Sequence, residues 1–273
     1  MKRPRRLLVA IVGLAALAYA GYRVYTHERT VQPAIVTPQM DAQQALSPSL
    51  AGHLKRLVNE RVTYGNRANR PKLIALTFDD GPYPVFTPLL LEQLHRLHVH
   101  ATFFLIGRDA EQWPQLAERI EAEGNEIANH TFTHPNLDQE SRAQVREEIL
   151  QGRDALYRLV HDPSVKTYFR PPHGRYTTAT VQVAQKLGYT TLLWTDDSGD
   201  WRSVTPATLE QHLERYATAP EVALLHSGRL ATIEMLPAVV ARFRDAGYRF
   251  VTVKELLGRV TAAELNHPAK HPV

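Results

Sequence analysis

Cysteine is missing from this sequence, which excludes disulfide bonds and metal sites built from thiolates. Internal repeats and low-complexity tracts are also absent, so nothing competes with an ordinary globular architecture. A strong excess of one charge is lacking too, because 32 Lys and Arg residues face 28 Asp and Glu residues. Four of the cations fall within the first six positions. Since the remaining charges nearly balance, a polyanionic partner such as a nucleic acid is not expected.

One long apolar run is present, at the N-terminus. "MKRPRR" is followed by sixteen residues without a charge, "LLVAIVGLAALAYAGY", which is typical of an export signal. Residues 1–25 are therefore predicted to be a signal anchor whose basic end stays in the cytoplasm, or a signal peptide cleaved near Ala18-Tyr19-Ala20. An anchor would hold the chain at the inner membrane of a bacterial cell envelope by a single pass, whereas cleavage would release it. Both forms place the rest of the chain outside the cytoplasm.

The remaining 248 or so positions divide by pattern into three parts. Residues 26–70, with scattered Pro, Gln, Thr and Ser, are predicted to be a linker ending in a lead-in helix. Residues 71–260 are predicted to form the main domain, and 261–273 a C-terminal tail. In the main domain, short apolar segments alternate with helical patterns, which indicates a parallel α/β fold, either a barrel or a doubly wound sheet. The strands are expected at 73–78, 101–107, 126–130, 167–170, 190–195, 222–226 and 249–253, and the helices at 87–98, 109–123, 139–160, 177–187, 206–217 and 234–246.

Two adjacent carboxylates end the first of these strands, in "TFDDGP". Neighbouring side chains on a strand point to opposite faces, but at a strand end Asp79 and Asp80 could face one cavity. Two like charges at close range resist ionising together unless a cation or an arginine lies beside them. The sequence is therefore expected to supply one.

A pair of histidines offers a site for such a cation. In "HTFTH", His130 and His134 are four residues apart, so in a single helical turn both imidazoles would point the same way. With Asp80 as third ligand they would form a facial site suited to catalytic zinc, with positions left open. Coincidence or packing in the core is the alternative, since the chain has thirteen histidines. The cluster His95, His98 and His100 is expected to be only a solvated helix flank.

Asp79 would then be free to act as a general base. Arg170, in "FRPPHG", could pair with it and lower its pKa, or could instead form an ordinary surface or packing salt bridge. The two prolines and Gly174 make a stiff loop that could present a backbone N–H to a developing oxyanion.

Five motifs in this order, "TFDDGP", "HTFTH", "RPPHG", "DSGDW" and "LLH", resemble the signature of the NodB-homology polysaccharide deacetylases, carbohydrate esterase family four. The resemblance spans about residues 72–258. It implies a distorted (β/α) barrel that uses zinc, or another divalent ion such as Co²⁺, Ni²⁺ or Mn²⁺, to remove acetyl groups from sugars.

The resemblance also implies a role for each matching residue. Asp79 would be the catalytic base, oriented by Arg170, and the metal ligands would be Asp80, His130 and His134. The N–H of His173 would stabilise the oxyanion, and Trp201 and Leu224 would form two walls of the acetyl pocket. His226 would be the general acid, with Asp200 as its partner. Two positions depart from the family pattern, which often has tyrosine at His173 and aspartate at Ser227.

The expected function is therefore metal-dependent N-deacetylation of an N-acetylglucosamine polysaccharide such as peptidoglycan, a chitin-like glycan or poly-N-acetylglucosamine. An O-acetyl esterase acting on a glycan such as xylan is the alternative with the same chemistry. An inactive glycan-binding module tethered to the envelope is the alternative from another class. The expected partners are the glycan and the membrane, with the oligomeric state left open.

Overall fold

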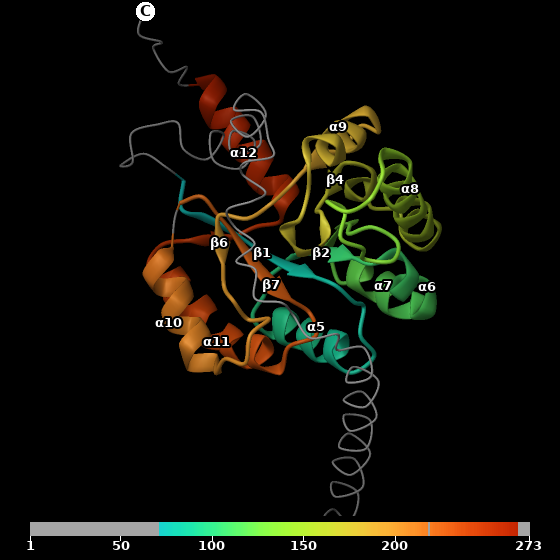
Figure 1. The fold of residues 1–273 in the computed structure, drawn as a ribbon. Helices are drawn as coiled ribbons and strands as arrows, with labels where there is room; N and C mark the ends of the chain where they lie inside the picture. The colour runs from blue at the N-terminus through green and yellow to red at the C-terminus, as the bar shows by residue number, and fades with distance from the viewer. Residues whose placement is uncertain (1–70, 218, 267–273) are drawn as a thin grey trace, which may run out of the picture. The chain divides into compact units, whose positions relative to one another are not determined.

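The computed structural model describes residues 71–217 and 219–266, the side chains of 216 and 260–266 excepted. Eight strands form one parallel sheet (Figure 1): β1 (Leu73–Asp79), β2 (Thr102–Leu105), β3 (Glu126–Asn129), β4 (Tyr168–Phe169), β5 (Thr190–Thr191), β6 (Asp196–Asp197), β7 (Glu221–His226) and β8 (Arg249–Phe250). The helices are α5 (Phe86–Arg96), α6 (Gly107–Gln112), α7 (Pro114–Ala122), α8 (Arg142–Leu159), α9 (Thr178–Lys186), α10 (Pro206–Tyr216), α11 (Leu230–Asp245) and α12 (Val253–Asn266), with short 3-10 turns at Pro163–Lys166 and Pro172–Gly174.

The sheet is curled but open. Its strands follow the order β5-β4-β3-β2-β1-β7-β6, and β8 pairs with the beginning of β1. The two ends of this path, β5 and β6, do not pair with each other in the described part of the chain. The predicted parallel α/β fold is confirmed, and the distorted barrel is realised as a half-barrel. β1 lies at its centre, paired with β2, β7 and β8.

Alternate residues of β1 face two different environments, as the period of two in a strand requires. Ile74, Leu76 and Phe78 belong to a large apolar core. This core also contains buried side chains of α5, α7, α10 and α11. Leu73 and Ala75 face the other way and pack against α12, which Figure 1 shows apart from α5, α10 and α11.

The second face of β1 changes character along its length. Leu73 and Ala75 are followed at the same period by Thr77 and then Asp79, all buried. Buried polar groups need partners, so this end of the strand requires a set of polar side chains from its neighbours. The apolar end is closed by α12, and the polar end is the place for a site.

Several local expectations are wrong. The strands expected at 190–195 and 249–253 stop at Thr191 and Phe250, and the helix α12 was not expected. The segment 109–123 is two helices, because Pro114 begins α7 after a break at Trp113. Asp196 and Asp197 form the short strand β6, which two acidic residues did not indicate. α11 begins at Leu230 rather than at 234. The "HTFTH" segment is not helical.

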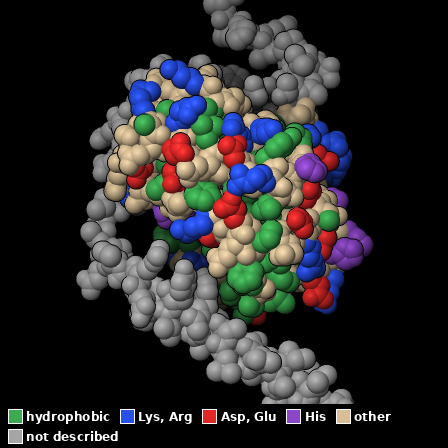
Figure 2. Space-filling view, turned by 90° about the vertical axis from the view of Figure 1, so that its right-hand side faces the viewer, with side chains coloured by type: hydrophobic (Ala, Val, Ile, Leu, Met, Phe, Trp, Pro, Cys, Tyr) green, Lys and Arg blue, Asp and Glu red, His purple; other side chains and the backbone are tan. Residues whose placement is uncertain are grey.

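The predicted signal anchor at 1–25 and the linker at 26–70 lie outside the described residues. Within 71–217 and 219–266, no helix is both long enough and apolar enough to cross a membrane. The domain limits at 71 and 260 stay predictions, although α12 continues past 260 to Asn266. On the face shown in Figure 2, basic and acidic side chains are interspersed.

Helix α8 approaches the loop after β3 so closely that only glycine fits at position 152. A Cβ there would lie 2.6 Å from Asn129 Oδ1 and 2.7 Å from the carbonyl carbon of Thr131. We expect Gly152→Ala to lower the free energy of unfolding by about 1–3 kcal/mol through overpacking, although alanine is the better helix former.

A matched control is available in α12, where a Cβ at Gly258 would meet nothing within 4 Å. Gly258→Ala should raise stability by up to about 1 kcal/mol. Urea unfolding of both variants measures the difference. Equal gains in stability would contradict the close contact between α8 and the loop.

Candidate active site

The carboxyl ends of the parallel strands bring the sequence-predicted residues to one edge of the sheet. Asp79 ends β1 and His226 ends β7, and these two residues are direct partners in the register of the strands. His130 follows β3, and Arg170 follows β4. Loops after parallel strands meet at this edge because all strands run the same way.

Asp79 and Asp80 face the same region because the backbone adopts a left-handed conformation directly after Asp79. Asp80 has φ 70° and Gly81 φ 74°, so the alternation of the strand ends at Asp79. Ser227 stabilises this turn. Its N–H and its hydroxyl donate to the carbonyl of Asp79, and the hydroxyl lies equally close to the carbonyl of Asp80. A Cβ on residue 81 would lie 2.8 Å from Ser227 Oγ, so glycine is needed there.

Arg170 is the cation beside Asp79. Its Nη1 donates to Asp79 Oδ1 at 2.6 Å and to Thr77 Oγ1 at 2.8 Å. Its other nitrogens donate to the carbonyls of Leu192 and Leu193. The side chain is fully buried, with its guanidinium 4.0 Å from the centre of the Phe104 ring. The pairing is therefore a buried, oriented contact and not a surface salt bridge.

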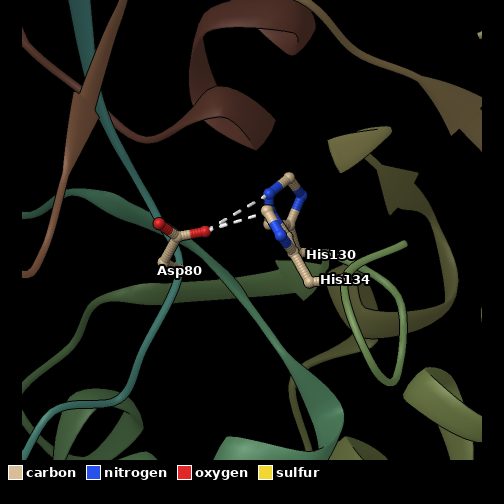
Figure 3. Close-up of side chains that lie close together, drawn as sticks. All are labelled: Asp80, His130 and His134. Atoms are coloured by element: carbon tan, nitrogen blue, oxygen red, sulfur yellow. Dashed lines mark ion pairs between the residues drawn. The ribbon is translucent and has the colours of Figure 1, made fainter. Parts of the chain in front are cut away.

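Asp80, His130 and His134 form a group that could hold a metal ion. One possible ligand atom from each lies within 4.8 Å of the others, and Figure 3 shows both imidazoles near the carboxylate. His134 Nε2 is 3.2 Å from Asp80 Oδ1, and His130 Nε2 is 3.8 Å from the same oxygen. His130 Nδ1 lies 2.8 Å from the carbonyl of Arg170, so that nitrogen carries the proton and Nε2 is left with its lone pair.

The charges of these groups suit a divalent cation. Burial lowers the pKa of His130 to about 4, despite the opposing pull of Asp79, so this imidazole is neutral at pH 7. Burial alone would raise the pKa of Asp80, but its hydrogen bond to His134 and the charges of the surrounding histidines lower it below the ordinary value. A neutral imidazole and an ionised carboxylate are the forms that bind metal. The donor set of two histidines and one carboxylate therefore fits a divalent ion such as zinc.

The histidines converge through a loop and not through the helical turn expected from their spacing. Residues 130–134 have no helix, and both Thr131 (φ 70°) and His134 (φ 64°) are left-handed. Asn129 Oδ1 accepts from the N–H of Thr131, and Thr131 Oγ1 accepts from the N–H of His134. The i, i+4 argument reached the right pair of residues from a wrong local structure.

His226 is bound to Asp200 through two contacts. Its Nδ1 is 2.7 Å from Asp200 Oδ1, and its backbone N–H donates to Asp200 Oδ2 at 2.7 Å. Thr232, on α11, donates to the same Oδ2 at 2.6 Å. Burial lowers the pKa of His226, but the hydrogen bond and charge of Asp200, with the charges of Asp80 and Asp79, outweigh it and raise the pKa to about 9.

The remaining predicted residues flank this group. Leu224, on β7, is only 3% exposed, whereas Trp201 is 46% exposed and its Nε1 lies 3.4 Å from Asp197 Oδ1. The ring of His173 lies edge-on to that of His134, 4.5 Å between centres, and His173 has φ 58°. Its backbone N–H has no hydrogen-bond partner in the described part of the chain. The cluster His95, His98 and His100 is exposed, as predicted.

Sequence reasoning missed the residues that hold the site together. Thr77 is bonded to Arg170, and Thr232 is bonded to Asp200. Ser227 is bonded to the turn after β1, and Asn129 and Glu148 are bonded to the loop 130–134. Thr77 carries a signal, because it is a polar residue within an apolar strand at the same period as Asp79. The others are polar residues in ordinary positions, and only their neighbours in space reveal what they do.

The raised pKa of His226 predicts a pH-dependent stability. A folded pKa of about 9 against an ordinary 6.5 means that the stabilisation is complete below pH 6.5 and is lost as pH rises through about 9. In the presence of a chelator, the stability difference between the wild type and His226→Gln should shrink over this range by up to about 3 kcal/mol. Urea unfolding at several pH values measures it, and Asp200→Asn should reduce the trend, leaving only the contribution of the Asp80 and Asp79 charges. An NMR titration of wild-type His226 near pH 6.5 would contradict the pairing.

Comparisons with known proteins agree with this geometry. The polysaccharide deacetylase family model matches residues 66–192. A peptidoglycan-N-acetylglucosamine deacetylase of Bacillus cereus is 37% identical over 69% of this chain and 90% of its own length. A chitooligosaccharide deacetylase of Sinorhizobium fredii is 35% identical over 63% of this chain and 79% of its own length. A solved structure of a peptidoglycan N-acetylglucosamine deacetylase is similar with a TM-score of 0.65 and 32% identity, over 68% of this chain and 88% of that one. The chain therefore belongs to the polysaccharide deacetylases of carbohydrate esterase family four, as its five motifs indicate.

Proposed function

We propose that this polysaccharide deacetylase removes the N-acetyl group from N-acetylglucosamine units of a polysaccharide outside the cytoplasm, with the help of a divalent metal ion. One observation carries the proposal. A buried carboxylate, Asp79, lies outside the Asp80–His130–His134 group but beside it, with Asp79 Oδ2 3.7 Å from His130 Nε2. A base next to a cation is the arrangement that metal-assisted hydrolysis of an amide requires.

The substrate class is supported by what the relatives act on. The relatives from B. cereus and S. fredii are named for the deacetylation of peptidoglycan N-acetylglucosamine and of chitooligosaccharides. Both names share the N-acetylglucosamine unit. We therefore infer this unit as the substrate of the present protein, with peptidoglycan, a chitin-like glycan or poly-N-acetylglucosamine as its polymer.

Asp80, His130 and His134 would hold the metal, and zinc suits two neutral imidazoles and a carboxylate, with Co²⁺, Ni²⁺ or Mn²⁺ as alternatives. When bound, the ion supplies a Lewis acid that polarises the acetyl carbonyl and makes water more acidic. Asp79 takes the proton of the attacking water. Arg170 holds Asp79 in one rotamer and balances its charge, and the carbonyl of Arg170 holds His130.

We propose that the N–H of His173 receives the oxyanion. The ring of His173 contacts the ring of His134, so residue 173 and its N–H lie next to the proposed metal ligands. Donors that are fixed before the reaction stabilise the developing charge without reorganisation. Only the backbone of residue 173 acts in this step, so the histidine found there in place of tyrosine is compatible with it. Leu224 and Trp201 would bound the acetyl group.

His226 completes the reaction as the general acid. Its Nδ1 is held by Asp200, so the proton on Nε2 is the one that can be given to the leaving nitrogen. Its raised pKa keeps the imidazolium populated near neutral pH. Ser227, where the family often has aspartate, contacts the carbonyls of Asp79 and Asp80 and is not a partner of the acid.

Location outside the cytoplasm is a separate part of the proposal. It rests on the basic and apolar N-terminus, which is typical of an export signal. An uncleaved signal anchor would keep the domain in the envelope close to its glycan, and a cleaved signal would release it. A fusion of residues 1–70 to a reporter active only outside the cytoplasm tests the export.

Replacement of the base gives the first test of the activity. Asp79→Asn should lower kcat for acetate release about 10²–10⁴-fold, because the amide cannot accept the proton. Acetate is measured with peptidoglycan, chitin oligomers and acetyl-xylan as substrates, and bound metal is measured by elemental analysis. Asp154→Asn, on the exposed face of α8, is the control. A metal-loaded wild type no faster than Asp79→Asn would favour a glycan-binding module without activity.

Replacement of the acid separates amide from ester chemistry. An amine leaves only after protonation, whereas an alkoxide leaves more readily. His226→Ala should therefore lower the rate on N-acetyl substrates at least 10²-fold, and the rate on O-acetyl substrates by less. The two rates are compared on chitin oligomers and acetyl-xylan. Equal losses on both, or a wild type that prefers acetyl-xylan, would favour the O-acetyl esterase.

A further inference from the structure

We propose that Glu148, on α8, is a positioning residue that holds the loop between the two histidine ligands and thereby sets the affinity of the site for its metal. The proposal rests on the proposed function only in taking His130 and His134 as ligands. Glu148 itself does not reach the ligand atoms. It contacts two of the three residues that separate the histidines in the sequence, Phe132 and Thr133.

The loop needs holding because its backbone is strained. Thr131 and His134 both have positive φ, which β-branched and other non-glycine residues rarely adopt. Such conformations persist only where the surroundings over-determine them. The position of the His134 imidazole relative to Asp80 therefore depends on the contacts of residues 131–133.

The two sides of the loop are held by different groups. On the inner side, the carbonyls of Thr131 and Phe132 accept from the N–H groups of Gly107 and Arg108 at the start of α6. Asn129 Oδ1 accepts from the N–H of Thr131. These contacts fix the carbonyls and the first N–H, but none of them uses the N–H groups of Phe132 and Thr133.

Glu148 accepts from both of these N–H groups and from the hydroxyl of Thr133. Its Oε2 accepts from the N–H of Phe132 at 3.0 Å and from the N–H of Thr133 at 2.8 Å. Its Oε1 accepts from Thr133 Oγ1 at 2.6 Å. One half-buried carboxylate thus receives three hydrogen bonds from two adjacent residues, directly before His134.

Helix α8 is a rigid base for this contact. Gly152, one turn after Glu148, packs against Asn129 and Thr131 without room for a side chain. Asn129 also donates to the carbonyl of Ile149, the residue after Glu148. The helix, the loop and the end of β3 are therefore joined by close contacts, and Glu148 adds a contact next to the second ligand.

The two histidines should depend on Glu148 unequally. His130 is buried and its Nδ1 is bound to the carbonyl of Arg170, which follows β4 and is not part of this helix. The backbone of His134 is held by Thr131 Oγ1 within the same loop. Loss of Glu148 would therefore release His134 and leave His130 in place, so that the metal would lose one preorganised ligand.

The test is zinc titration of the metal-free protein by calorimetry, with a competing chelator to bring the affinity into range. Glu148→Ala should bind zinc about 10- to 100-fold more weakly, the effect typical of residues that orient metal ligands. Glu148→Gln should stay within about threefold of the wild type. Its amide oxygen can accept from both backbone N–H groups, and its NH₂ can donate to the Thr133 hydroxyl. Glu147→Ala, on the same helix and paired with Gln151, is the control and should not change the affinity.

Hydrogen exchange gives a second readout that does not depend on metal. The amides of Phe132 and Thr133 should lose at least tenfold of their protection in Glu148→Ala and keep it in Glu148→Gln. Should Glu148→Ala not fold, Glu148→Asp replaces it, because its shorter side chain cannot reach all three donors.

Three results would overturn the proposal. The first is wild-type zinc affinity in Glu148→Ala, and the second is unchanged protection of the two amides. The third is a loss in Glu148→Gln as large as in Glu148→Ala, which would assign the effect to charge and not to the position of the loop. A wild type that binds no zinc contradicts the proposed function instead, and the exchange experiment still decides whether Glu148 holds the loop.

Discussion

The site depends on the buried guanidinium of Arg170. Its side chain contacts Asp79 and Thr77, and its main-chain carbonyl orients His130. One residue thus joins the proposed base to a proposed ligand. Two adjacent carboxylates at a buried strand end would otherwise repel each other, and a buried charge without a partner is costly. Arginine suits this position because its charge is permanent and its fork of donors also satisfies the carbonyls of Leu192 and Leu193.

The sheet explains why the polar groups gather at one end. The face of β1 that carries Asp79 begins with Leu73 and Ala75, which α12 covers. Burial of the apolar end anchors the strand, and the polar end meets side chains from the ends of β3, β4 and β7. The stable part of the fold and the reactive part therefore share one strand, with the large core under α5, α10 and α11 supporting both from the other face.

The sequence predicted which residues gather at the proposed site better than it predicted the local structure that places them. "TFDDGP" indicated a strand ending at two acids, because an apolar β-rich run stops at Gly81 and Pro82. The convergence of His130 and His134 was anticipated from helical spacing, whereas it comes from left-handed residues held by Asn129 and Glu148. Such contacts join residues with no common pattern in the chain. The short strand β6, made of Asp196 and Asp197, was missed for a related reason: its pairing with β7 overrides a low strand propensity.

The register between β1 and β7 limits which parts of the proposed site can vary among related proteins. Asp79 and His226 are partners across two hydrogen-bonded strands, so the main chain sets the separation of the proposed base and the proposed acid. Trp201 and Leu230 are exposed and belong to the loop before α10 and to the start of α11, outside this pair of strands. Selectivity for different glycans can therefore diversify at the periphery while the chemistry is inherited unchanged with the backbone.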